Sequence, residues 1–197
     1  MKLIFSVLFL LIIGYYTYLF VFLLVKMRGN IILPIKEEEL SSLRKFPQKP
    51  VDLPTYSKQK VGIIIYALML VYLIAMYVIG VLNTNIEWTY YLLLFLPLSY
   101  SHNLLNIFAV VRDGLISGSS FIPWKKVRRF YFVPIVSQHK SYGYSKEANN
   151  GYELIIKGRL FSTSCIVTSE EMKEKLTAIL SENVTVKGEN LNLNECK

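Results

Sequence analysis

Residues 3–25 read LIFSVLFLLIIGYYTYLFVFLLV, an apolar run that contains no charged side chain. An α-helix rises about 1.5 Å per residue, so about 20 residues cross the ~30 Å hydrocarbon core of a bilayer. A secretory signal peptide is the rival interpretation, but its apolar region has only ~7–15 residues and ends in small side chains. Tyr15, Tyr16 and Tyr18 occupy that place here. The run therefore predicts an uncleaved transmembrane helix within residues 1–25.

Two further apolar blocks without charges follow, Val61–Leu82 and Tyr90–Val111. Each is long enough to cross a bilayer as a helix. The segment between them, Asn83–Thr89, is too short to be anything but a turn. Residues 61–111 therefore predict a transmembrane hairpin, in which Pro97 is expected to kink the second helix. Together with the first run, the sequence predicts three transmembrane helices.

The composition of the whole chain agrees with a membrane protein. The 197 residues are 53% hydrophobic and 18% charged, and the mean hydropathy is +0.38. An ordinary soluble domain is ~25% charged. Because the apolar excess is concentrated in three blocks, the composition excludes a disordered chain and a disulfide-built secreted module. It indicates a small integral membrane protein with a modest soluble part.

Lysine and arginine are distributed unevenly around the three blocks. Segment 26–60 holds eight of the 22, the turn 83–89 holds none, and segment 112–197 holds 13. Cytoplasmic flanks of membrane proteins carry the excess of Lys and Arg. The distribution therefore predicts a multi-pass protein of the cell membrane, with the N-terminus outside and both basic segments in the cytoplasm.

Four prolines interrupt segment 26–60: Pro34, Pro47, Pro50 and Pro54. Prolines at this density favour an extended path and prevent one continuous helix, so the segment is predicted to be a cytoplasmic loop. Lys36–Phe46 predicts a short helix within it, with Leu40 and Leu43 on one face. This helix could bind a partner or the membrane interface, or it could be a solvated linker, and the sequence leaves both open.

Segment 112–183 predicts a small cytoplasmic domain in which strands precede one helix. Four stretches are rich in β-branched and aromatic residues or alternate in polarity, which is typical of strands or bent strand pairs: 114–118, Phe121–Val136, Tyr152–Lys157 and Leu160–Val167. Pro123 is expected at a sheet edge or a bulge. The polar stretch Ser137–Gly151 is predicted to be a mobile loop.

The last predicted element is an amphipathic helix over Ser169–Leu180. Thr168 and Glu171 have the spacing of a capping box. One face of the helix is apolar at helical spacing: Met172, Leu176, Ile179 and Leu180. This stripe is too small to stabilise an isolated helix, so it must cover a sheet. Residues 184–197 are predicted to be a polar tail with at most one short strand at 184–187.

Two motifs lie at the start of this domain, the short strand 114–118 and the turn FIPWKKV at residues 121–127. With the strands and the helix that follow, segment 112–183 resembles the pleckstrin-homology-like (PH-like) domains of uncharacterised membrane proteins from Gram-positive bacteria. The resemblance implies an antiparallel sheet or partial barrel capped by the C-terminal helix. The predicted fold is thus an α-helical membrane region plus a small α+β PH-like domain. Some of these proteins are implied in immunity to secreted peptide toxins, so the resemblance also suggests bacteriocin immunity.

A basic run beside aromatic residues is one candidate site: Trp124, Lys125, Lys126, Arg128 and Arg129. Cations at a membrane surface attract anionic lipid heads, at about 1 kcal/mol each. The run could bind lipid or a partner, or it could be ordinary positive charge near the inner leaflet. Nucleic acid is disfavoured as a partner, because the domain is tethered to the membrane and its net positive charge is modest.

The second candidate is a polar stripe late in the third block: Ser99, His102, Asn103 and Asn106. On a helix these residues would share one face. Polar side chains in hydrocarbon are costly and usually find partners. The stripe could be a site for a ligand, an ion or a proton, or it could join helices by hydrogen bonds.

The sequence offers little support for catalysis. The histidines and cysteines are few and far apart, so no metal site is predicted: His102, His139, Cys165 and Cys196. Residues 114–118 lack the lysine of a phosphate-binding loop. The sequence therefore predicts a non-enzymatic protein without a cofactor, whose cytoplasmic domain binds another protein or inner-leaflet lipid. Peptide-toxin immunity is the alternative and a small transporter or enzyme the third, while the partner and the oligomeric state stay open.

Overall fold

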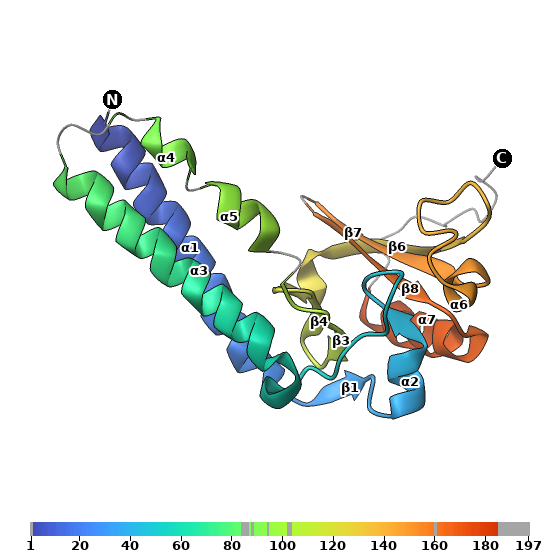
Figure 1. Cartoon of the computed structure of the whole chain (residues 1–197). Helices are drawn as coiled ribbons and strands as arrows, with labels where there is room; N and C mark the ends of the chain where they lie inside the picture. The colour runs from blue at the N-terminus through green and yellow to red at the C-terminus, as the bar shows by residue number, and fades with distance from the viewer. Residues whose placement is uncertain are drawn as a thin grey trace.

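The structure, a computed structural model, describes residues 2–83, 87, 89–93, 95–101, 104–159 and 161–184. A helical part and a sheet domain lie side by side (Figure 1). The helices are α1 (Lys2–Met27), α2 (Glu37–Ser41), α3 (Tyr56–Leu82), α4 (Tyr90–Leu93), α5 (Phe95–Tyr100), α6 (Lys146–Asn149) and α7 (Glu170–Asn183), with one 3₁₀ turn, η2 (Trp124–Lys126). The strands are β1 (Ile31–Leu33), β2 (Leu43–Arg44), β3 (Phe108–Val111), β4 (Gly114–Ser117), β5 (Ser120–Pro123), β6 (Val127–Pro134), β7 (Tyr152–Gly158) and β8 (Ser162–Val167).

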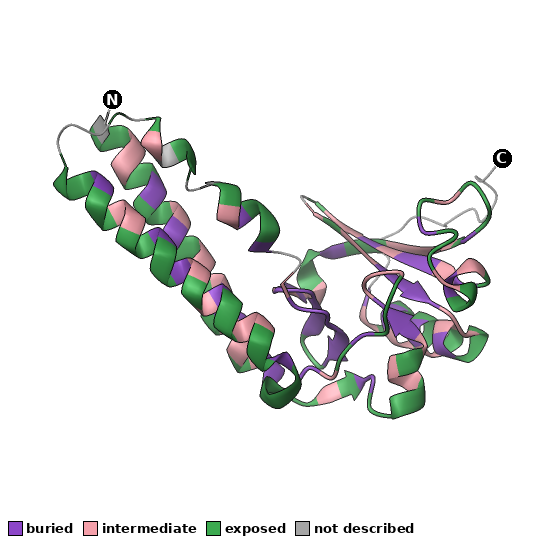
Figure 2. Cartoon of the chain, viewed as in Figure 1, coloured by how far each residue is buried: buried purple, intermediate pink, exposed green. Residues whose placement is uncertain are grey.

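Helices α1 and α3 form an antiparallel pair (Figure 1). Both are long and apolar enough to cross a membrane, and only 22% and 17% of their most apolar windows are buried within the molecule. The stacked rings of Phe20 and Tyr66 join them, with centroids 4.4 Å apart. Elsewhere they expose apolar side chains, such as Leu11 and Val71, and much of both helices has the exposed colour in Figure 2. The first two predicted blocks are therefore confirmed as helices, although α3 begins five residues before its predicted block.

The third predicted block is not one helix over 90–111. The short helices α4 and α5 occupy its first half, and strand β3 occupies Phe108–Val111. All four residues of β3 are buried. A strand that is covered on both faces has no polar alternation, so its sequence looks like the end of a membrane-spanning block.

The sheet domain consists of two four-stranded antiparallel sheets. The first sheet has the order β1-β3-β4-β5 and the second has the order β2-β8-β7-β6. Strands β1 and β2 come from segment 26–60, so this segment is not simply a loop and the domain is larger than the predicted 112–183. The predicted helix over Lys36–Phe46 is correspondingly shorter, because α2 ends at Ser41 and the chain then enters β2.

Two apolar cores cover the two faces of the first sheet. Neighbouring residues of a strand point to opposite faces. Leu115 faces the core between the sheets, which includes Leu154 and Leu176 of α7. Ile116 faces the other way, into a core with Leu23 at the end of α1. The two central strands of the first sheet, β3 and β4, are thus buried between the second sheet and the helical part, and both have the buried colour in Figure 2.

The later predicted strands agree with the structure. Phe121–Val136 is a bent strand pair, in which η2 separates β5 from β6, and Pro123 ends the edge strand β5. Helix α7 buries its predicted apolar face. The predicted capping box is wrong, because Ser169 is the N-cap and Thr168 donates a backbone bond to Ser42 O. Of the predicted turn 83–89 and strand 184–187, most residues lie outside those described.

Candidate functional site

The predicted basic run lies where the chain passes from the first sheet to the second. Trp124 begins η2 and donates a hydrogen bond from Nε1 to Arg112 O at 3.0 Å, which ties η2 to the β3–β4 turn. Val127 then points into the core between the sheets. With these two residues anchored, Lys125 and Lys126 remain exposed.

A bulge places the two arginines that follow on the surface. Val127 pairs with Gly158 and Arg129 pairs with Lys157, so the register shifts at Arg128. A bulge leaves one extra residue unpaired, and Arg128 and Arg129 are both exposed as a result. Arg129 therefore lies directly across the sheet from Lys157. Like charges opposite each other destabilise a sheet.

Six cations from these elements form what we call the basic surface: Lys125, Lys126, Arg128, Arg129, Lys157 and Arg159. None of them forms an ion pair with a residue that the structure describes. By contrast, Lys26, Lys140 and Lys175 each face a carboxylate. Sequence reasoning missed the contribution of β7. The Lys157-Gly158 turn marks where β7 ends. That end lies beside the basic run only because β7 pairs with β6, and the sequence does not show this pairing.

Strand β5 holds the basic surface close to the end of α1. The rings of Phe121 and Phe22 meet edge-on, with centroids 5.3 Å apart. The Nζ atom of Lys26 lies 5.1 Å from the Phe121 ring and 2.6 Å from Oδ2 of Asp113 in the β3–β4 turn. Because η2 starts three residues after Phe121, these contacts keep η2 and its two lysines near the last turn of α1.

The two members of the predicted polar stripe that the structure describes, Ser99 and Asn106, do not lie on one helical face. Ser99 is exposed on α5 and donates a hydrogen bond to Leu96 O. Asn106 lies beyond the end of α5, where it is buried and donates from Nδ2 to Pro50 O at 2.6 Å. It therefore ties the chain before β3 to the segment before α3. His102 and Asn103 lie outside the described residues.

A lysine among hydroxyl groups is the arrangement closest to catalytic chemistry. The Nζ atom of Lys45 donates to Ser117 Oγ at 2.9 Å, to Thr163 Oγ1 at 3.2 Å and to Ser164 O at 3.3 Å. Burial lowers the pKa of Lys45. An ammonium group has three donors, and all three are used here. The cluster therefore cross-links β4 of the first sheet to β8 of the second.

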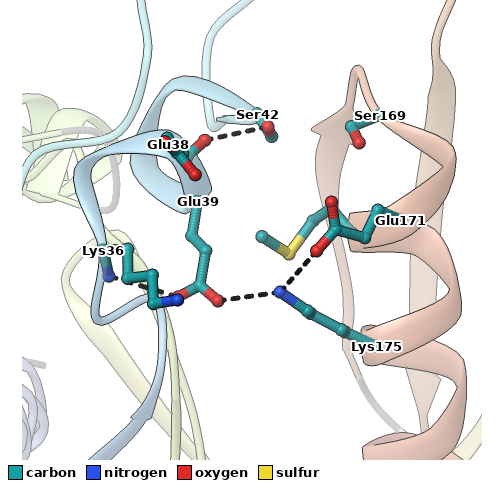
Figure 3. A pocket seen from close by; sticks show the side chains of 8 residues that line it. Lys36, Glu38, Glu39, Ser42, Ser169, Glu171 and Lys175 are labelled. Carbon is teal, nitrogen blue, oxygen red and sulfur yellow. Dashed lines mark hydrogen bonds and ion pairs between the residues drawn. The ribbon is translucent and has the colours of Figure 1, made fainter.

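A shallow pocket lies between α2 and α7, where charged side chains converge (Figure 3). The Nζ atom of Lys175 lies 3.2 Å from Glu39 and 2.8 Å from Glu171. Glu39 also accepts backbone bonds from Ile35 and Lys36, and these bonds hold its pKa below the ordinary value. The ion pair between Lys175 and Glu39 therefore joins α7 to α2.

The cysteine that the structure describes is buried and unreactive. Burial raises the pKa of the Cys165 thiol to about 12, which keeps it protonated at neutral pH. Cys196 lies outside the described residues. No group of three His, Cys, Asp or Glu side chains among the described residues could hold a metal ion.

Glu153 is a buried carboxylate that holds the loop between β6 and β7. Its oxygens lie 2.9 Å from Lys140 Nζ and 2.9 Å from His139 Nε2. Burial raises the pKa of Glu153. The hydrogen bonds from Lys140, Ser164 and His139, together with the charge of Lys140, lower it by more than burial raises it, so the pKa lies below its ordinary value.

This shift predicts an acid-sensitive stability. A depressed folded-state pKa contributes stability that is present above the unfolded-state pKa, ~4.3, and lost as the pH falls through the folded-state value. We expect Glu153→Gln to weaken that pH dependence. The measurement is the unfolding temperature of the full-length protein in detergent between about pH 6 and pH 3. Equal slopes for the native chain and the variant would contradict the prediction.

Comparison with known proteins finds no match among protein-family models, curated proteins or solved structures. The functional conclusion therefore rests on the charge and geometry of the basic surface.

Proposed function

We propose that this chain is a non-enzymatic membrane protein whose sheet domain lies against the inner leaflet and binds anionic lipid headgroups through the basic surface. The lipid phosphates would take the place of the missing carboxylate partners. In this proposal α1 and α3 cross the bilayer, the N-terminus lies outside, and the sheet domain is cytoplasmic, as the distribution of Lys and Arg predicts.

The path of the chain supports a third crossing. Helix α3 leads from Tyr56, beside the sheet domain, to Leu82 at the far end of the α1–α3 pair (Figure 1). The chain must return from there to reach β3. Helices α4 and α5 lie on that return path, alongside the pair. Non-helical backbone at membrane depth needs cover from protein or water, so we propose a broken third span rather than one continuous helix.

The arrangement of the sheets supports a PH-like domain. Two antiparallel sheets share one core, and α7 packs into that core with Met172, Leu176 and Leu180. This agrees with the resemblance drawn from the FIPWKKV motif. Toxin immunity stays a prediction of that resemblance, and no contact among the described residues favours it over lipid binding.

The observation that carries the proposal is the pair of like charges Arg129 and Lys157 across β6 and β7. Such a pair costs stability. Four more cations lie on the adjoining turn, bulge and strand end, and none of the six forms an ion pair with a carboxylate among the described residues. An anionic ligand removes this cost. The surface also lies near the inner end of α1, where headgroup phosphates are available.

Removing two of these cations should reduce lipid selectivity. Each cation near an anionic surface contributes about 1 kcal/mol, so we expect Arg128→Gln with Arg129→Gln to lower the preference for phosphatidylglycerol over phosphatidylcholine roughly thirtyfold. The measurement is the association of spin-labelled lipids with the full-length protein in vesicles.

A variant of equal charge provides the control for this experiment. Lys36→Gln with Lys49→Gln removes two exposed cations outside the basic surface, and we expect it to keep the preference. The proposal fails if both double variants lose the same amount, because the effect would then follow net charge alone.

A further inference from the structure

The loop between β6 and α6 exposes apolar and aromatic side chains at the end of β6 opposite the basic surface. Val136, Tyr142 and Tyr144 have 55%, 44% and 56% of their surfaces exposed. Tyrosine has an apolar ring with a polar tip, and such side chains gather at membrane–water boundaries. Two exposed tyrosines on one loop of the sheet domain are therefore candidates for contact with a membrane surface.

Several hydrogen bonds brace this loop from beneath. His139 N donates to Val136 O at 2.8 Å, and Tyr142 N donates to His139 O at 2.9 Å. The backbone N–H of Ser141 donates to His139 Nδ1 at 3.1 Å, so Nε2 carries the ring proton and donates it to Glu153. The loop therefore presents its tyrosines on a fixed base.

Two further features hold the tip of the loop. Gly143 has a φ of +87°, which a glycine adopts without strain. Its N–H donates to Asn149 Oδ1 at 2.7 Å. Ile135 and Ala148 pack on Ile166 below the loop. Ordering of the exposed rings on contact with a surface thus requires little change in the backbone.

The loop and the basic surface lie at opposite ends of one edge strand. Strand β6 has eight residues, and at about 3.3 Å per residue it is roughly 25 Å long. In Figure 1, β6 and this loop lie on the side of the sheet domain toward which α1 and α3 extend, whereas α2 and α7 lie on the opposite side. A bilayer around the helices would therefore face both ends of β6.

We infer that Tyr142 and Tyr144 insert into the interfacial region of the inner leaflet and form a second, charge-independent membrane contact. The inference rests on the proposed placement of the domain against the membrane. Together the two contacts hold β6 parallel to the bilayer surface. The loop contacts the boundary between headgroups and acyl chains, a region in which aromatic rings with hydroxyl tips are stable.

The test places a single tryptophan on the loop of the full-length chain. In a background with Trp88→Phe and Trp124→Phe, the variants carry Tyr142→Trp or Tyr144→Trp. They are reconstituted in vesicles of phosphatidylcholine with and without bromine on the acyl chains near the headgroup. We expect roughly a twofold loss of emission, because an interfacial ring lies within ~5–10 Å of the acyl boundary.

The matched control is Ala178→Trp, at an exposed position of α7 on the far side of the domain. Its emission should not change. Equal emission of the loop tryptophans with and without bromine would overturn the inference, and equal quenching of all three variants would do the same. Phosphatidylcholine vesicles carry no net charge, so the loop contact does not depend on the basic surface in this test. If only the phosphatidylglycerol preference were absent, the charge-based proposal would be refuted and the loop contact would still hold.

Discussion

Replacing Gly114 with valine should unfold the sheet domain. Gly114 pairs with Pro123 across β4 and β5. A Cβ atom at this position would meet the carbonyl oxygen of Ile122 and would lie 2.8 Å from the Cα atom of Pro123. Both are backbone atoms, so neither can rotate away. Overpacking costs about 1–3 kcal/mol where side chains can shift, and we expect a larger loss here.

The measurement is the unfolding of full-length Gly114→Val in detergent, followed by tryptophan fluorescence and protease resistance. Gly14→Val is the control, because a Cβ atom at Gly14 of α1 meets nothing within 4 Å. We expect the control to unfold like the native chain. If Gly114→Val did so too, β4 and β5 would not pair as the structure has them.

The second large effect concerns the attachment of the sheet domain to the helices. Ile116 is fully buried beside Leu23, Met27 and Leu105. An aspartate there would be a buried charge without a partner, which costs about 3–5 kcal/mol. We expect Ile116→Asp to separate the first sheet from the end of α1.

Cross-linking measures this separation directly. With cysteines at Phe22 and Phe121, whose rings touch in the structure, a short bis-maleimide should join α1 to β5 in the native background after Cys196→Ser. Cys165 is buried and should not react. The cross-link should disappear with Ile116→Asp and persist with Ile116→Val, which removes one methylene for about 0.5–1.5 kcal/mol. Undiminished cross-linking of the aspartate variant would contradict the contact between the sheet and the helices.

The basic surface shows how far a candidate site can be predicted from sequence. The run around Lys125 and Arg128 is contiguous, so its charge is visible without a structure. Lys157 and Arg159 join it only because β7 pairs with β6 in one register. A strand partner can come from any distance along the chain, and its register depends on turns and packing.

Asn106 illustrates the opposite error. Its spacing from Ser99 fits a helical face, but α5 ends at Tyr100. Asn106 instead bonds to Pro50 O, 56 residues away. Helical spacing places two polar residues on one face only if one helix contains both of them, and spacing alone cannot show where a helix ends.

By itself the sequence determined the two long helices and the amphipathic α7, because uninterrupted or periodic apolar residues specify helices through local geometry. It also determined the uneven charge that predicts the orientation. Only the tertiary structure decided that Phe108–Val111 is a strand, that segment 26–60 supplies β1 and β2, and that Lys157 and Arg159 lie at the same end of the second sheet as the basic run. The physical reason is that strand pairing and burial on two faces depend on contacts between residues far apart in the chain, which no local pattern records.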